Sequence, residues 1–123
     1  MVTVTRGDVV LCDLNPVIGT EQSGIRPVVI VQIDRANAVS PHTIIAPFTS
    51  KIRRALLPSH VFVPAGVGGL SQDSVVLREQ IRVIDKSRIT RVIGHLNDAY
   101  MEELAIALSA IFGLSNSEDN SQE

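Results

Sequence analysis

The chain has 123 residues, enough for one domain with one core, because folding at this size buries roughly two-thirds of the unfolded chain's surface. Hydrophobic residues make up 45% of it, yet no apolar run approaches the roughly 20 residues that span a bilayer and no signal-peptide stretch opens it, so we expect a cytoplasmic protein without a membrane segment. The net charge of −2 neither supports nor excludes a nucleic-acid partner, and the single cysteine, Cys12, excludes an internal disulfide and a two-cysteine metal or redox site.

Short apolar or alternating runs, separated by Gly, Pro, Asn and Asp, occupy the first three-quarters of the chain and are typical of β-strands. The six runs lie at residues 8–14, 26–33, 43–49, 59–64, 74–77 and 79–85. A turn or single helical turn over DKSR and a further short strand over ITRVIGHL follow. This number of short strands predicts a small barrel or a strongly twisted sheet.

From Asn97 onward the hydrophobic period changes to three and four, which predicts an amphipathic C-terminal helix. Asn97 or Asp98 can cap its start and Gly113 can close it. We expect residues 1–114 to form the single domain and the polar residues 115–123 to be a disordered tail. Three of the 13 acidic residues lie in that tail, which leaves 10 against 11 basic residues elsewhere.

The loop over residues 15–25, NPVIGTEQSGI, joins the first two predicted strands and is too long for a tight hairpin turn. It presents Glu21 and Gln22 between two glycines and then delivers Arg26 at the mouth of a strand. Loops of this length usually carry function or are mobile. From the pattern alone, a solvated loop that ends in a surface arginine fits these residues better than a catalytic site does.

Two further segments could contact phosphate. Thr49 ends a predicted strand directly before the basic segment KIRR, and a hydroxyl beside positive charges could form a phosphate cradle. In REQIR, a period of two places Arg78, Gln80 and Arg82 on one strand face. An ordinary strand end and a solvated charged face remain the simpler interpretations of the two segments.

The three histidines, His42, His60 and His95, invite a histidine-pair ribonuclease or a metal site. None of them lies at a ligand spacing from another, so each is more readily a structural residue. We therefore expect neither a metal ion nor a cofactor.

Read together, these segments resemble the MazF/PemK family of toxin endoribonucleases from bacterial toxin-antitoxin systems. The resemblance runs from RGDVVLCDLNPVIGTEQSGIRPVVIVQ through APFTSKI, LPSHV and DSVVLREQIRVIDKSRI to IGHLNDAYMEEL, and only the acidic tail falls outside it. The first block is the most specific part, because a strand, the G-[ST]-E-Q loop, the R-P pair and an apolar strand follow in the family's order.

The resemblance implies a mainly β (α+β) fold, namely an SH3-like small β-barrel of the CcdB/PemK kind with a C-terminal helix. It also implies a homodimer that is inhibited by an antitoxin, whose flexible tail lies in the RNA groove. The implied activity is sequence-specific cleavage of single-stranded mRNA without a metal ion. A ribose 2′-hydroxyl attacks the adjacent phosphorus, which gives a 2′,3′-cyclic phosphate and a 5′-hydroxyl end.

Carried over by position, the resemblance implies that Arg26 and Thr49 are catalytic and that Glu21 is the candidate base. Arginine is a poor proton carrier near neutrality, so we expect Arg26 to stabilise the phosphorane while Glu21 or another group moves the protons. The residues that we expect to bind RNA are Gly19, Thr20, Gln22, Ser23, Gly24, Ser50, Lys51, Arg53, Arg78 and Gln80.

Two alternatives differ in function. A gyrase-binding toxin of the CcdB kind would share the barrel but depends on an aromatic C-terminal end, whereas this chain ends in SEDNSQE. A non-catalytic RNA-binding or interaction module would keep the basic segments but would not need Arg26 and Thr49 together. With one tyrosine, three phenylalanines and no tryptophan, a base-stacking platform is hard to assemble.

Overall fold

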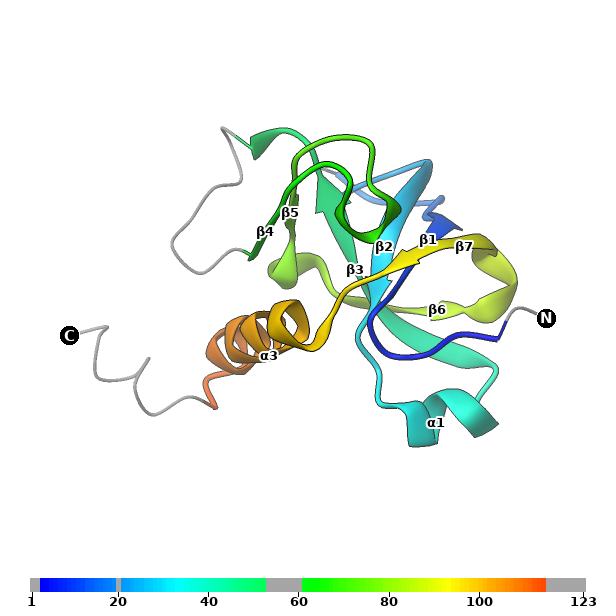
Figure 1. Cartoon of the computed structure of the whole chain (residues 1–123). Helices are drawn as coiled ribbons and strands as arrows, with labels where there is room; N and C mark the ends of the chain where they lie inside the picture. The colour runs from blue at the N-terminus through cyan, green and yellow to red at the C-terminus, as the bar shows by residue number, and fades with distance from the viewer. Residues whose placement is uncertain (1–2, 20, 53–60, 115–123) are drawn as a thin grey trace.

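A computed structural model of the chain describes residues 3–19, 21–52 and 61–114. Its centre is an antiparallel sheet in the order β4-β5-β3-β2-β1-β7, with β6 paired to β3 (Figure 1). The strands are β1 (Asp8–Asp13), β2 (Ile25–Ile30), β3 (His42–Thr49), β4 (Val61–Val63), β5 (Ser74–Val76), β6 (Arg82–Asp85) and β7 (Ile89–His95). The expected mainly β fold is confirmed.

The sheet does not close into a complete barrel. β7 pairs with β1 and β4 pairs with β5, and no pairing between described strands joins β4 to β7. The 3₁₀ turn η1 (Val67–Gly69) packs along β7 instead. At this contact Gly94 comes so close to Gly68 that a Cβ on Gly94 would lie 2.2 Å from the Gly68 carbonyl carbon.

The central strands are buried on both faces, which explains their nearly continuous apolar runs. One face packs against the helix α3 (Asp98–Ile111), and the other is covered by β6, the start of β7 and the N-terminal segment. Because neighbouring strand residues point to opposite faces, Val9 and Val10 enter different cores. The first core contains Val29, Ala46, Phe48, Leu96 and Leu104, and the second contains Val28, Ile30, Ile45, Ile84 and Ile89.

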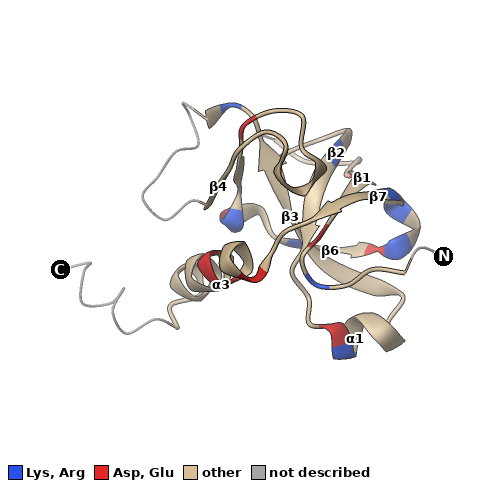
Figure 2. Ribbon diagram, viewed as in Figure 1, with Lys and Arg blue, Asp and Glu red and all other residues tan. Residues whose placement is uncertain are grey.

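The C-terminal helix forms as predicted. The Asn97 side chain accepts a hydrogen bond from the Tyr100 N–H at 3.2 Å, and Gly113 adopts φ +73° just after the helix. Met101, Leu104 and Ala107 are buried against the sheet. The helix carries acidic residues but neither Lys nor Arg (Figure 2), so its outer surface does not favour phosphate.

Two local elements differ from the sequence prediction. Residues Arg78–Gln80 form a 3₁₀ turn, η2, so the prediction that Arg78, Gln80 and Arg82 share one strand face is wrong. The reason is that the β5–β6 segment leaves the Phe48 end of β3, bends through η2 and rejoins β3 at Ile45.

The second difference is a short helix, α1 (Asp34–Val39), which the sequence did not indicate. It is fixed by the buried Asn37, whose Oδ1 accepts from Thr43 Oγ1 at 2.8 Å and whose carbonyl accepts from Lys86 Nζ. The predicted helical turn at DKSR is present as η3 (Lys86–Arg88). The expectations for Thr20, Arg53, the first residues of the 59–64 run and the 115–123 tail fall outside the described residues. No described helix is long and apolar enough to cross a membrane.

Candidate active site

The loop between β1 and β2 is held by hydrogen bonds between its two ends. The Leu14 N–H donates to Gly24 O at 3.0 Å, and the Gly24 N–H donates to Asn15 Oδ1 at 3.2 Å. The Gln22 N–H reaches outside the loop and donates to Gln80 Oε1 in η2 at 3.0 Å. The loop is therefore held both at its base and near its tip.

Sheet register brings the two strand residues of the predicted site together. β2 and β3 are antiparallel, and Val28 pairs with Pro47. Continuing that register by two residues places Arg26 opposite Thr49. The β1–β2 loop, which precedes Arg26, then lies beside the segment that follows Thr49.

A pocket of about 190 Å³ lies at this junction. It is lined by Glu21, Gln22, Ser23, Arg26, Thr49, Ser50 and Lys51. All three residues predicted to be catalytic, and four of those predicted to bind RNA, therefore lie around one space, which we call the reaction pocket.

Arg26 is exposed and its guanidinium has a fixed direction. Its Nε donates to the Ser23 carbonyl at 2.9 Å. Among the described residues, none accepts a hydrogen bond from its two terminal nitrogens, so these nitrogens can contact an anion with the paired geometry of a guanidinium.

Thr49 is buried, with 6% of its surface exposed. Its Oγ1 accepts from the Lys51 N–H at 3.1 Å, so the hydroxyl hydrogen can donate toward the pocket. The same hydrogen bond folds the chain back after β3, which brings Ser50 and Lys51 to the pocket wall.

Glu21 is exposed, and one of its carboxylate oxygens, Oε1, accepts from the Ile18 N–H at 3.0 Å. That contact holds the carboxylate within the loop, while the second oxygen remains able to accept a proton. The pocket therefore combines two cationic side chains, three hydroxyls and one carboxylate, a set suited to phosphate-ester chemistry.

The reaction pocket continues into a second pocket on each side. One, of about 270 Å³, shares Glu21 and Gln22 with it and also contains Gln80 and Arg82. The other, of about 220 Å³, shares Arg26 and Ser50 and extends to Ser71, Gln72 and Ser74. Sequence reasoning missed this last group, because an ordinary polar turn between two short strands carries no distinctive signal.

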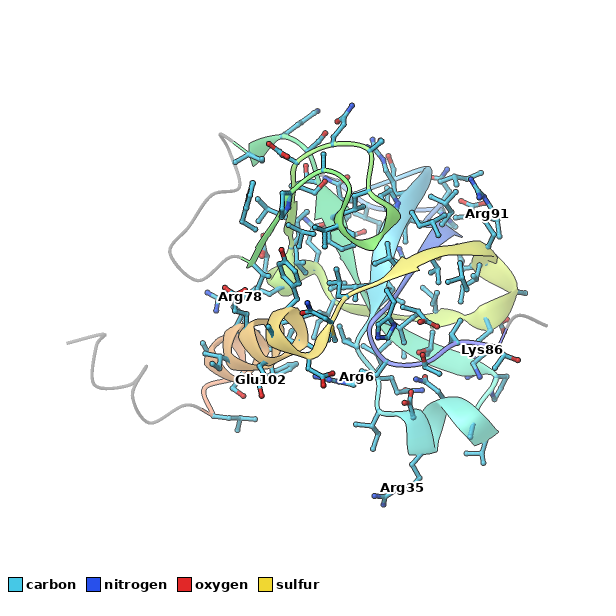
Figure 3. The ribbon with its side chains drawn as sticks, in the orientation of Figure 1. Arg6, Arg35, Arg78, Lys86, Arg91 and Glu102 are labelled. Atoms are coloured by element: carbon cyan, nitrogen blue, oxygen red, sulfur yellow. The ribbon has the colours of Figure 1, made fainter. Side chains whose placement is uncertain are left out.

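Several predicted RNA-binding residues lie elsewhere. Gly19 and Gly24 adopt φ of +65° and +79° in the loop but do not line the reaction pocket. Arg78 points toward α3 (Figure 3), where its Nη1 donates to the Ala107 carbonyl at 2.9 Å. Gln80 lines the neighbouring pocket and holds the loop rather than lining the reaction pocket.

The histidines of the described residues do not enter the reaction pocket. His95 Nδ1 lies 2.9 Å from Asp8 Oδ1, at the start of β1, and His42 starts β3 at the end opposite Thr49. Over the described ranges, no group of three His, Cys, Asp or Glu side chains could hold a metal ion.

Comparisons with known proteins cover most of the chain. Residues 5–112 match the PemK-like, MazF-like toxins of type II toxin-antitoxin systems. The chain is 48% identical over 111 residues to endoribonuclease EndoA of Bacillus subtilis (strain 168), which covers 90% of this chain and 96% of that relative.

Solved structures share the fold. MazF (Form-I) from Deinococcus radiodurans superimposes with a TM-score of 0.79 at 25% identity, over 92% of this chain and 99% of that one. An endoribonuclease in complex with its cognate antitoxin, from a mycobacterial species, does so with a TM-score of 0.73 at 23% identity, over 94% and 98%.

Proposed function

The chain belongs to the PemK-like, MazF-like toxins of type II toxin-antitoxin systems, and from this membership we propose a metal-independent cleavage of single-stranded RNA in the cytoplasm, centred on Arg26. It is an endoribonuclease, and the gyrase-binding and non-catalytic alternatives are set aside. The observation that carries the proposed chemistry is that Arg26, Thr49 and Glu21 line one pocket.

In the proposed reaction the ribose 2′-oxygen attacks the adjacent phosphorus, forming a P–O2′ bond while the P–O5′ bond breaks. One fragment then ends in a 2′,3′-cyclic phosphate and the other in a 5′-hydroxyl. The 2′-hydroxyl proton passes to a base, and the leaving 5′-oxygen takes a proton from solvent. The balance needs no further reactant.

Arg26 stabilises the transition state. Negative charge grows on the phosphoryl oxygens as the phosphorane forms, and Arg26 lines the pocket while its Nε donates to the Ser23 carbonyl. A donor that is already oriented loses no free energy to reorientation at that moment, which is why such groups contribute strongly to catalysis.

Glu21 and Thr49 have separate roles in this proposal. Glu21 takes the 2′-hydroxyl proton through the carboxylate oxygen that Ile18 does not hold. The Thr49 oxygen accepts from the Lys51 N–H, and its hydroxyl hydrogen donates to a nonbridging phosphate oxygen. Lys51 and Ser50 contact the flanking phosphates.

The partners follow from the family. We propose that the chain acts as a homodimer and is neutralised by a cognate antitoxin, whose flexible tail occupies the groove formed by the reaction pocket and its two neighbours. A tail in that groove would cover Arg26 and Thr49, so inhibition requires no change of fold.

The test is to incubate the purified protein with long RNA of mixed sequence in the presence of EDTA and to map the cut ends. Discrete cuts with cyclic-phosphate and 5′-hydroxyl ends support the proposal. Cleavage that is random, or that stops when EDTA is added, would overturn the mechanism.

A further inference from the structure

We propose that the pocket on the Arg26 side of the reaction pocket binds the base of a nucleotide next to the cleaved bond, and that Gln72 recognises this base. This inference rests on the proposed RNA cleavage at Arg26. It assigns a recognition role to a turn that carries none of the predicted catalytic residues.

The pocket on the Arg26 side is continuous with the reaction pocket. The two pockets share Arg26 and Ser50, so a phosphate held by Arg26 lies at the boundary between them. A nucleotide joined to that phosphate therefore has its base within reach of the second pocket, which we call the base pocket.

The lining of the base pocket suits a neutral heterocycle better than a phosphate. Pro27, Phe48 and Leu70 supply apolar surface, and Ser71, Gln72 and Ser74 supply polar atoms. Arg26, at the boundary, is the one charged residue among the described lining residues. A nucleobase has apolar faces and a polar edge, and it can be read on that edge when a single strand is splayed.

The pocket on the other side has a different lining. It contains Glu21, Glu79 and Arg82, so it combines two carboxylates with one guanidinium. Because carboxylates repel the negatively charged sugar-phosphate backbone, this pocket is a weaker candidate than the base pocket for binding a nucleotide next to the cleaved bond. The two sides of the groove are therefore chemically distinct, and the base pocket is the one whose described lining residues include no acidic side chain.

The turn that carries Gln72 is braced by its own hydrogen bonds. The Ser74 hydroxyl donates to the Gln72 carbonyl at 2.9 Å, and Asp73 Oδ1 accepts from the Ala65 N–H at 2.8 Å. Leu70, just before the turn, is buried in the core. The backbone at Gln72 is thus fixed with respect to the sheet.

The side chain of Gln72 is available for recognition. It is exposed, and none of the described residues takes part in a hydrogen bond with its amide group. A primary amide offers two donors beside one acceptor, which matches an adjacent acceptor and donor on a base edge. Such a pair discriminates between bases in a way that a serine hydroxyl, which donates or accepts freely, does not.

The experiment maps the cleavage preference of the full chain on an RNA library randomised around the cut. We expect Gln72→Ala to lower the preference for one base at a single position by roughly tenfold, the effect of one lost bidentate contact. Gln72→Glu, which keeps the shape but removes both donors, should shift that preference toward bases with a donor edge. Preferences at all other positions should stay as in the wild type.

Controls separate this inference from the proposed function. Arg35→Ala, on the exposed start of α1 (Figure 3), should leave every preference unchanged, and thermal unfolding should show that the Gln72 variants remain folded. If the wild type cuts at discrete sites and both Gln72 variants keep its preference at every position, the base pocket is wrong while RNA cleavage stands. If the wild type does not cut RNA, the proposed function fails and the base pocket fails with it.

Discussion

The backbone N–H of Gln22 donates to Oε1 of Gln80 at 3.0 Å, across 58 positions of sequence. Gln80 lies in η2, and Arg78 in the same turn donates to the Ala107 carbonyl in α3. The loop that carries Glu21 is therefore linked through one 3₁₀ turn to the C-terminal helix.

Removing the Gln80 side chain should loosen the loop without unfolding the protein. A typical hydrogen bond contributes about 1 kcal/mol, so we expect Gln80→Ala to lower kcat by roughly tenfold at most. Arg78→Ala should instead lower the melting temperature and change cleavage less, because its bond joins η2 to α3 and does not reach the reaction pocket. Steady-state kinetics and thermal unfolding of the two variants check this division, and equal losses of kcat in both would contradict it.

Arg26→Ala should lower cleavage by roughly 100-fold or more, the usual effect of removing one transition-state donor. Arg26→Lys should recover little, because an ammonium cannot reproduce two parallel donors. Since Arg26 is exposed, both variants should melt close to the wild type. The control is Arg91→Ala on β7, whose side chain is exposed and lines none of the three pockets of the groove (Figure 3). Wild-type cleavage by Arg26→Ala would rule out its assigned role.

Two substitutions of Thr49 test the role of its hydroxyl. Thr49→Ser keeps the hydroxyl and should retain most activity, whereas Thr49→Val loses both the acceptor for the Lys51 N–H and the proposed phosphate donor. Because Thr49 is buried, thermal unfolding of both variants must be measured beside cleavage. The ratio of the cleavage rates of Thr49→Ser and Thr49→Val then shows whether the hydroxyl takes part in the reaction. Similar activities in these two variants would show that the hydroxyl takes no part.

Cys12 should be unreactive in the folded protein. Burial raises the pKa of its thiol from 9.0 to about 11, while the nearby Arg88 and Arg82 act in the opposite direction. At pH 8, Ellman's reagent should label the protein in denaturant and not in buffer. Because the folded state holds this proton more tightly, the free energy of unfolding should fall as pH rises from 9 toward 11. Cys12→Ala should remove that part of the pH dependence, and rapid labelling of the native protein would contradict the prediction.

The contact between η1 and β7 should tolerate no side chain. In Gly94→Ala the new Cβ would meet backbone 2.2 Å away, so β7 or η1 must move and a loss of several kcal/mol, typical of severe core overpacking, is expected. Gly66→Ala is the matched control, since its Cβ meets none of the described residues within 4 Å and bears only the cost of a positive φ. Denaturant unfolding of the two variants measures the difference, and comparable stabilities would refute the steric argument.

Much of the fold followed from hydrophobic pattern, for identifiable reasons. The central strands have continuous apolar runs because both their faces are buried, and the Asn97 cap and the three-and-four period define α3. The six-residue α1 is too short to show a period, and Ile33 at its N-cap gives no side-chain capping bond, so no local signal marked it. The η2 turn was hidden because its position is set by β3, which changes partner between Ile45 and Phe48.

The candidate site was predicted in part. Arg26, Thr49 and Glu21 were singled out by resemblance, and their shared pocket depends on a register between β2 and β3 that no local pattern reveals. Gln72 could not be singled out, because its proximity to Arg26 arises from tertiary structure alone.

The residues of the groove that face solvent, among them Gln22, Ser23, Ser50, Ser71 and Gln72, lie on connecting segments, and the two cores are built from other positions. Substitutions at exposed positions usually change stability by no more than about 0.5 kcal/mol. The proposed RNA contacts can therefore be changed one at a time while both cores, and with them the fold, stay intact.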